Sequence, residues 1–155
     1  MQRKEKNPEK QRVFSLAVEM CTDGIVIGDL TGKITYVNQA LLKIYGSMDK
    51  TDLIGKHILE FIAEKDRART TQISMECQKT GKCITTEFEA LPKNGVEFPV
   101  EATISVIKDD GTQIGFIDVV RDIKERKKAE QTLKKQAQLI NLSPHPIIVK
   151  KSMTQ

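Results

Sequence analysis

The sequence is poor in the residues that build metal, disulfide and chromophore sites. Its 155 residues include no tryptophan, two histidines and three cysteines. An odd number of cysteines without a CxxC pair indicates neither a zinc site nor a disulfide framework, so Cys21, Cys77 and Cys83 are expected to be ordinary thiols. His57 and His145 lie too far apart in sequence to suggest a metal site. No metal ligands are predicted.

Catalytic motifs are missing as well. The sequence has no GxxxxGK phosphate loop, no GxSxG elbow and no HExxH pair. It also lacks the phospho-accepting histidine region and the ATP-binding motifs of a histidine kinase. We therefore expect no enzymatic activity in this chain, and no catalytic residue is predicted. Any kinase or cyclase activity would belong to other residues of a longer parent protein.

Long apolar runs are absent too. No stretch approaches the roughly 18 apolar residues that cross a bilayer, and the first ten residues, MQRKEKNPEK, lack the apolar centre of a signal peptide. We expect a cytoplasmic location and no membrane contact by this segment.

The positive charge is confined to the ends of the chain. The formal net charge is +4, but residues 13–122 carry −5, while residues 1–12 carry +3 and residues 123–155 carry +6. Neither basic end contains an aromatic residue on which a base could stack. Nucleic-acid binding is therefore not predicted.

Five runs of apolar or alternating residues predict an antiparallel sheet. The first two flank a DLTG turn and the third and fourth flank an Asn-Gly turn, both typical of hairpins. Pro99 lies inside the fourth run, where its missing N–H favours a strand start, an edge or a bulge. The runs span residues 24–29, 33–37, 84–90, 98–106 and 114–120.

Helical patterns separate the second strand from the third. Asn38 is a good N-cap for a helix over 39–45, and Gly81 ends a longer helix over 67–80. Between them, a single helical turn is predicted at 51–54, and a short amphipathic helix from Lys56 to near Asp66. Strands and helices in this order indicate an α+β domain in which helices cover the apolar face of the sheet.

The domain organisation follows from changes in composition. Residues 1–12 are expected to form a charged arm or helix, and residues 13–122 suit one folded domain. A heptad pattern predicts a linker helix over 123–141. The HPIIV segment from His145 echoes DGIVI from Asp23, which suggests that residues 142–155 begin a second, truncated domain. The heptad positions are Ile123, Arg126, Glu130, Leu133, Ala137 and Ile140.

Four segments together resemble a PAS domain, a sensor module of signalling proteins. They are DGIVIGDLTGKITYVNQALLKIYG, LIGKHI, LPKNGVEFPVEATISVI and IGFIDVVRDIKERKKAE. The resemblance covers residues 14–122 and implies a PAS fold, with a five-stranded antiparallel sheet in the order 2-1-5-4-3 and helices cupping a cavity on one face. A C-terminal signalling helix would follow, in a parent such as a sensory histidine kinase of a two-component phosphorelay.

The last segment resembles the PAC exit motif Asp-Ile-Thr of this family. Asp122 and Ile123 match it, whereas Lys124 replaces the threonine. The resemblance implies that Asp122 and Ile123 couple the last strand to the outgoing helix. The implied partners are an output domain of the parent protein and a second copy that pairs through the flanking helices.

The resemblance also bears on cofactors. Flavin-binding light sensors of this family need an Asn-Cys-Arg motif and haem-binding members need a histidine on the long helix, and the sequence has neither. His57, just after Gly55, is expected to have a surface or capping role. We predict no cofactor, neither haem nor flavin, and an uncharged pocket for a small molecule. Its candidate wall residues, which in the alternative interpretation simply fill the core, are Phe61, Met75, Phe88, Val100 and Phe116.

Two functions remain open at this point. The first is a sensory domain that binds a small ligand or a partner and relays the change through its C-terminal helix to an output domain. The alternative is a ligand-free interaction module that mediates dimerisation.

Overall fold

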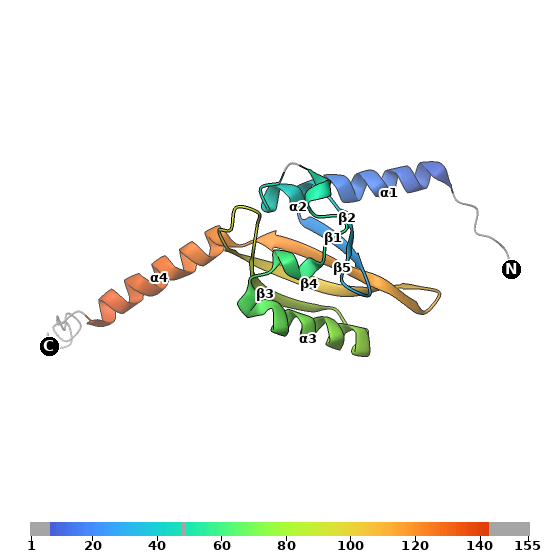
Figure 1. Ribbon diagram of the computed structural model, residues 1–155. Helices are drawn as coiled ribbons and strands as arrows, with labels where there is room; N and C mark the ends of the chain where they lie inside the picture. The colour runs from blue at the N-terminus through green and yellow to red at the C-terminus, as the bar shows by residue number, and fades with distance from the viewer. Residues whose placement is uncertain (1–6, 48, 143–155) are drawn as a thin grey trace, which may run out of the picture. The chain divides into compact units, whose positions relative to one another are not determined.

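Five antiparallel strands form one sheet in the computed structural model, which describes residues 7–47 and 49–142 (Figure 1). The order is β2-β1-β5-β4-β3, so the predicted fold class is confirmed. The chain divides into two units after Asp122, and each is taken by itself below. The strands are β1 (Gly24–Asp29), β2 (Ile34–Val37), β3 (Ile84–Ala90), β4 (Phe98–Asp109) and β5 (Thr112–Asp122).

The strands place the apolar residues of alternate positions on one face. Along β4, Phe98, Val100, Ala102 and Ile104 are buried while the residues between them are partly exposed. This alternation follows from the period of two along a strand. Pro99 is tolerated inside β4 because the pairing of β4 with β5 begins only at Val100, opposite Asp122.

The first helix, α1 (Pro8–Met20), crosses the predicted boundary between residues 12 and 13. The Asn7 side-chain oxygen accepts hydrogen bonds from the backbone N–H groups of Glu9 and Lys10, at 3.1 and 3.3 Å. Proline in the first helical turn loses no hydrogen bond, because that N–H has no partner within the helix. Helical structure therefore begins at Pro8 within the segment predicted as a charged arm or helix.

The helices between β2 and β3 are α2 (Gln39–Ile44), the short 3₁₀ helices η1 (Lys50–Asp52) and η2 (Ile58–Phe61), and α3 (Glu64–Thr80). The predicted helix from Lys56 to near Asp66 was wrong at its end. Ile62 pairs with Ala90 of β3 in an isolated bridge, and the N–H of Ala63 donates to the carbonyl of Glu89 at 2.8 Å. These bonds to the sheet hold the chain extended, and Asp66 already belongs to α3.

A continuous apolar core lies between the sheet and α2. Leu41 and Leu42 of α2 are each 2% exposed, and Val37 and Val100 are completely buried. The α3 helix runs beside β3 (Figure 1) and also contacts β4. Its buried residues are Thr70 and Cys77, so α3 presents a largely polar surface to the sheet.

The second unit contains α4 (Lys124–Leu142). Ion pairs of 3.8 Å join Glu130 to Arg126 and Lys127 along the helix. Leu133, Leu139 and Ile140 are each about two-thirds exposed. The echo beginning at His145, and with it most of the predicted second domain at 142–155, lies outside the described residues. In the part of the chain that the structure describes, no helix is both long enough and apolar enough to cross a membrane.

Candidate ligand-binding cavity

A cavity of about 230 Å³ lies between α3 and the sheet. Residues of β1, β3, β4 and β5 form its floor, α3 forms one side, and the β1–β2 turn and η2 contribute the rest of its lining. Most of its wall is apolar, as in pockets that enclose small organic molecules. The large apolar side chains are Val26, Leu30, Ile58, Leu59, Ile62, Met75, Phe88, Ile104 and Phe116.

The five predicted wall residues fall in three places. Met75, Phe88 and Phe116 line the cavity, with Met75 63% exposed on α3. Phe61 lines a smaller neighbouring cavity of about 20 Å³ instead. Val100 is completely buried within the core, because the cavity lies four residues further along β4, at Ile104.

The prediction of an uncharged pocket was wrong, because Asp118 of β5 lines both cavities. It lies at the centre of the sheet, opposite Val26 on one side and Ile104 on the other. Its Oδ1 atom is buried and has no hydrogen-bond partner among the described residues. Burial raises the pKa of Asp118 from 3.8 to about 7.

A sequence signal for Asp118 exists in the alternation of β5. Phe116, Asp118 and Val120 occupy every second position and therefore share one face, and Val120 is buried. An aspartate in register with inward-facing apolar residues is unusual, because burying an unpaired carboxylate is costly. The sequence pattern predicts only a fifth strand here, so Asp118 is not among the predicted pocket residues.

The hydroxyl groups on the α3 side of the cavity donate their protons within the helix. Thr70 Oγ1 lies 3.0 Å from the carbonyl oxygens of both Asp66 and Arg67. Thr71 donates to the carbonyl of Arg67 at 2.8 Å, and Ser74 donates to that of Thr70 at 3.1 Å. The protons of these hydroxyl groups are therefore engaged within the helix.

His57 serves as the N-cap of η2, as the predicted capping role requires. Its ring Nδ1 accepts a hydrogen bond from the backbone N–H of Leu59 at 3.2 Å. The backbone N–H of His57 donates to Glu60 Oε2 at 3.0 Å. Its Nε2 lies 2.8 Å from the carbonyl oxygen of Thr31, so the ring fixes the β1–β2 turn. The ring packs so closely on Gly32 that an added Cβ would lie 2.6 Å from Nε2. Both ring nitrogens are thus engaged in structure.

Groups that could hold a metal ion are missing from residues 7–47 and 49–142. No cluster of three or more histidine, cysteine, aspartate or glutamate side chains is placed to do so there. Cys77 is buried, and its Sγ donates to the carbonyl of Ile104 at 3.5 Å.

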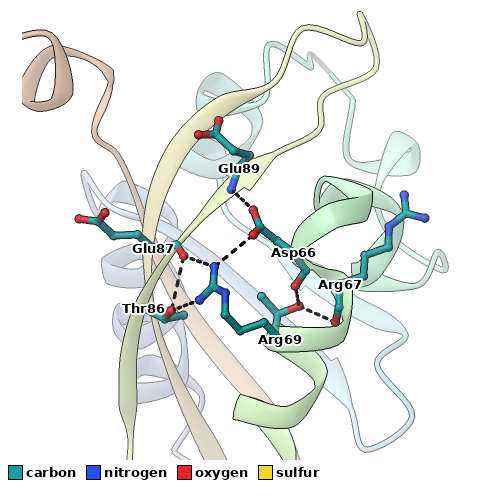
Figure 2. Close-up of polar contacts among 7 residues, drawn as sticks. Asp66, Arg67, Arg69, Thr86, Glu87 and Glu89 are labelled. Atoms are coloured by element: carbon teal, nitrogen blue, oxygen red, sulfur yellow. Dashed lines mark hydrogen bonds and ion pairs between the residues drawn. The ribbon is translucent and has the colours of Figure 1, made fainter. Parts of the chain in front are cut away.

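Polar contacts attach α3, which forms one side of the cavity, to strand β3 (Figure 2). Asp66 Oδ2 accepts from the N–H of Glu89 at 2.8 Å. Arg69 donates to Thr86 Oγ1 at 2.7 Å and to the carbonyl of Glu87 at 2.6 Å, and pairs with Asp66 at 3.3 Å. These contacts compensate for the small number of buried apolar residues on α3.

Replacing Asp66 with alanine is expected to lower the free energy of unfolding by about 1 to 2 kcal/mol, because the N–H of Glu89 loses a charged acceptor. Urea unfolding followed by circular dichroism measures the change. Glu64→Ala is the matched control, since it removes an exposed acidic side chain from the same turn of α3. Equal stabilities of the two variants would contradict the anchoring role of Asp66.

The predicted coupling residues lie where the two units meet in sequence. Asp122 is the last residue of β5, opposite Val100, and Ile123 precedes α4. Next to Asp122, the Arg121 guanidinium pairs with both carboxylate oxygens of Asp23, at 3.1 and 3.2 Å. This pair joins the end of β5 to the residue before β1.

Comparison with known proteins gives consistent matches. A family model described as PAS domain matches residues 22–125. The chain is 30% identical over 123 residues to the sensor protein kinase WalK of Staphylococcus aureus, a match that covers 79% of this chain and 19% of the length of WalK. The chain therefore spans about a fifth of that relative.

Solved structures share the fold. The PAS domain of a protein from Colwellia psychrerythraea superposes with a TM-score of 0.69 at 25% identity, over 77% of this chain and 99% of that one. A PAS domain from a two-component sensor histidine kinase gives a TM-score of 0.62 at 17% identity, over 75% and 99% of the two chains. At 17% identity the second likeness shows the fold alone.

Proposed function

The chain belongs to the PAS domain family, and we propose on that premise that it is a sensor module whose cavity binds a small molecule and whose α4 helix relays the bound state to an output domain. The observation that carries the proposal is the cavity of about 230 Å³ under α3, which Asp118 lines and beside which one carboxyl oxygen of that residue is buried without a hydrogen-bond partner among the described residues. Protein interiors are normally close-packed, and buried polar groups normally have partners. A bound ligand would fill the cavity and could supply a hydrogen-bond partner for Asp118.

Native mass spectrometry tests the binding step. The chain purified from its own cells is expected to be heavier under native than under denaturing conditions, by the mass of one small molecule. Ser74→Phe places a large side chain in the cavity and should abolish the difference. Glu76→Phe, on an exposed position of the same helix, should retain it. Identical native and denatured masses for the unsubstituted chain would contradict ligand binding.

The relay is assigned to the junction after β5. Asp122 ends that strand and Ile123 leads into α4, so both belong to the segment that must carry a change in the sheet onward. A packed element with two arrangements can transmit such a change. The family resemblance supports the same two residues.

Asp122→Ala is expected to remove the dependence of the parent protein's output on its stimulus while leaving the isolated fold largely intact. Output activity with and without stimulus measures the first effect, and circular dichroism the second. Asp109→Ala, at the exposed end of β4, is the control and should preserve the response. A normal response in Asp122→Ala would remove Asp122 from the relay.

The output domain is proposed to be a histidine kinase of a two-component phosphorelay. The support is the 30% identity to a relative named sensor protein kinase. In the parent, kinase activity would reside in residues other than these.

The cavity is proposed to hold neither flavin nor haem, because the residues that attach them in this family are missing from the sequence. We expect the purified protein to be colourless. Absorption spectra after expression under reducing conditions with both cofactors supplied provide the measurement. A visible band that survives gel filtration would contradict the proposal.

A second candidate function is dimerisation without a ligand. The observation that favours it is the apolar surface of α1, where Val13 and Phe14 are about 60% exposed and Met20 is 78% exposed. A second copy of the chain is the proposed occupant of that surface, since burial of apolar area drives association. Light scattering should then give twice the chain mass, and Phe14→Glu should give the monomer mass.

A further inference from the structure

The wall of the cavity disfavours negatively charged ligands. Among the described residues that line it, none is lysine or arginine, and His57 is already bonded on both ring nitrogens. Asp118 contributes a buried carboxyl to the floor. A phosphate or carboxylate ligand would be desolvated beside this group without a compensating cation, which is strongly unfavourable.

One carboxyl oxygen of Asp118 has no hydrogen-bond donor among the described residues. The hydroxyl protons of Thr70, Thr71 and Ser74 are donated to carbonyl groups of α3. The hydroxyl of Tyr45, which lines the smaller cavity together with Asp118, donates to the carbonyl of Phe61 at 3.1 Å. The buried Oδ1 atom of Asp118 has no hydrogen-bond partner among the described residues, although Gln78 also lines the cavity.

We infer that the ligand is a small organic cation, a compact apolar molecule with one protonated amine that donates to Asp118. This inference rests on the proposed ligand-binding function. The volume of about 230 Å³ sets the size, because on the scale of about 30 Å³ per water it has room for roughly eight non-hydrogen atoms. The apolar part of the molecule would contact Phe88, Ile104 and Phe116, and the amine would form a charge-assisted hydrogen bond at the floor.

Titration of Asp118 makes this preference depend on pH. Its carboxyl is protonated well below pH 7 and ionised well above it, because burial raises its pKa to about 7. The other titratable groups that face it are Tyr45 and Cys77, with His57 and Asp29 also lining the cavity. None of the four is a permanent cation that could replace the amine.

Three matched probes test the inference on the whole chain: 2-phenylethylamine, 2-phenylethanol and phenylacetate. Isothermal titration at pH 8 is expected to show the amine binding at least about tenfold tighter than the alcohol, because a hydrogen bond to a charged group is worth about that factor. Phenylacetate should not bind. At pH 6 the amine is still protonated, yet its affinity should fall about tenfold as Asp118 takes up a proton.

Asp118→Asn is expected to reduce amine affinity at pH 8 by about tenfold or more, and to leave the affinity for the alcohol within about threefold. Asp109→Asn, outside the cavity, should bind all three probes as the unsubstituted chain does. Loss of both amine and alcohol affinity in Asp118→Asn would overturn the inference, since it indicates general damage to the cavity. The pH series on the unsubstituted chain tests the same preference without any variant.

The remaining outcomes separate this inference from the proposed function. If amine and alcohol bind equally well, or phenylacetate binds best, the cavity accepts ligands but the cationic class is wrong. If no probe binds, the inference is overturned, while the native mass measurement described above decides independently whether the chain carries any ligand.

Discussion

Replacing Asp118 with asparagine is expected to raise the free energy of unfolding by about 2 to 4 kcal/mol at pH 8 and by well under 1 kcal/mol near pH 4. The carboxyl has a pKa of 3.8 when exposed and about 7 in the folded domain. Between these values the folded state binds more protons than the unfolded state, so the stability of the unsubstituted chain falls as pH rises. Three pKa units correspond to about 4 kcal/mol, and asparagine has the same shape without this ionisation.

Urea unfolding of both proteins between pH 4 and pH 8 provides the measurement. The difference in stability between them should grow with pH and level off above about pH 7. Asp109→Asn, at an exposed position, is expected to show no comparable pH-dependent gain. A gain that is constant across the pH range would mean that Asp118 is not buried as an unpartnered acid.

Replacing Asn38 with alanine is expected to lower the free energy of unfolding by about 3 to 5 kcal/mol. The side chain is completely buried and makes four hydrogen bonds. Its oxygen accepts from the N–H groups of Ile25 and Leu41 at 2.8 and 3.0 Å, and its nitrogen donates to the carbonyls of Val18 and Asp23 at 2.9 and 3.0 Å. Each buried group left without a partner costs about 1 to 3 kcal/mol, and α1, β1 and α2 lose their common connection.

Asn94→Ala is the matched control for Asn38. Its side chain accepts a single hydrogen bond in an exposed turn, from the N–H of Val96 at 2.9 Å. Thermal and urea unfolding should show a loss of less than about 1 kcal/mol for the control. If the two variants lost similar stability, the four bonds of Asn38 would contribute little beyond the solvation they replace.

The sequence predicted the strands well because each has a strong local signal. The alternation in β4 and the turn residues between β1 and β2 depend only on neighbours in the chain. Asn38 was likewise predicted as an N-cap, and it does accept from the N–H of Leu41. Its three other bonds join segments distant in sequence, which no local pattern specifies. The strand order came from the resemblance to a family rather than from periodicity.

The cavity was harder to predict because its position depends on strand register. Val100 and Ile104 are both inward-facing apolar residues of β4, and only the pairing of Ile104 with Asp118 places Ile104 at the cavity. The end of η2 was missed for a similar reason, since the bridge between Ile62 and Ala90 joins residues far apart in sequence.

The strand order also determines how the domain bears mechanical load. The pairing of β1 with β5 ends where Gly24 faces Val120, while β5 continues beside β4 for two further residues, to Asp122. Because the strands are antiparallel, tension applied at that end peels the hydrogen bonds apart one after another rather than shearing them together. The ion pair between Arg121 and Asp23 lies just beyond this end of the two strands. Two residues inward, Val26 faces Asp118 and both line the cavity, so separation of the strands from this end would soon reach the cavity.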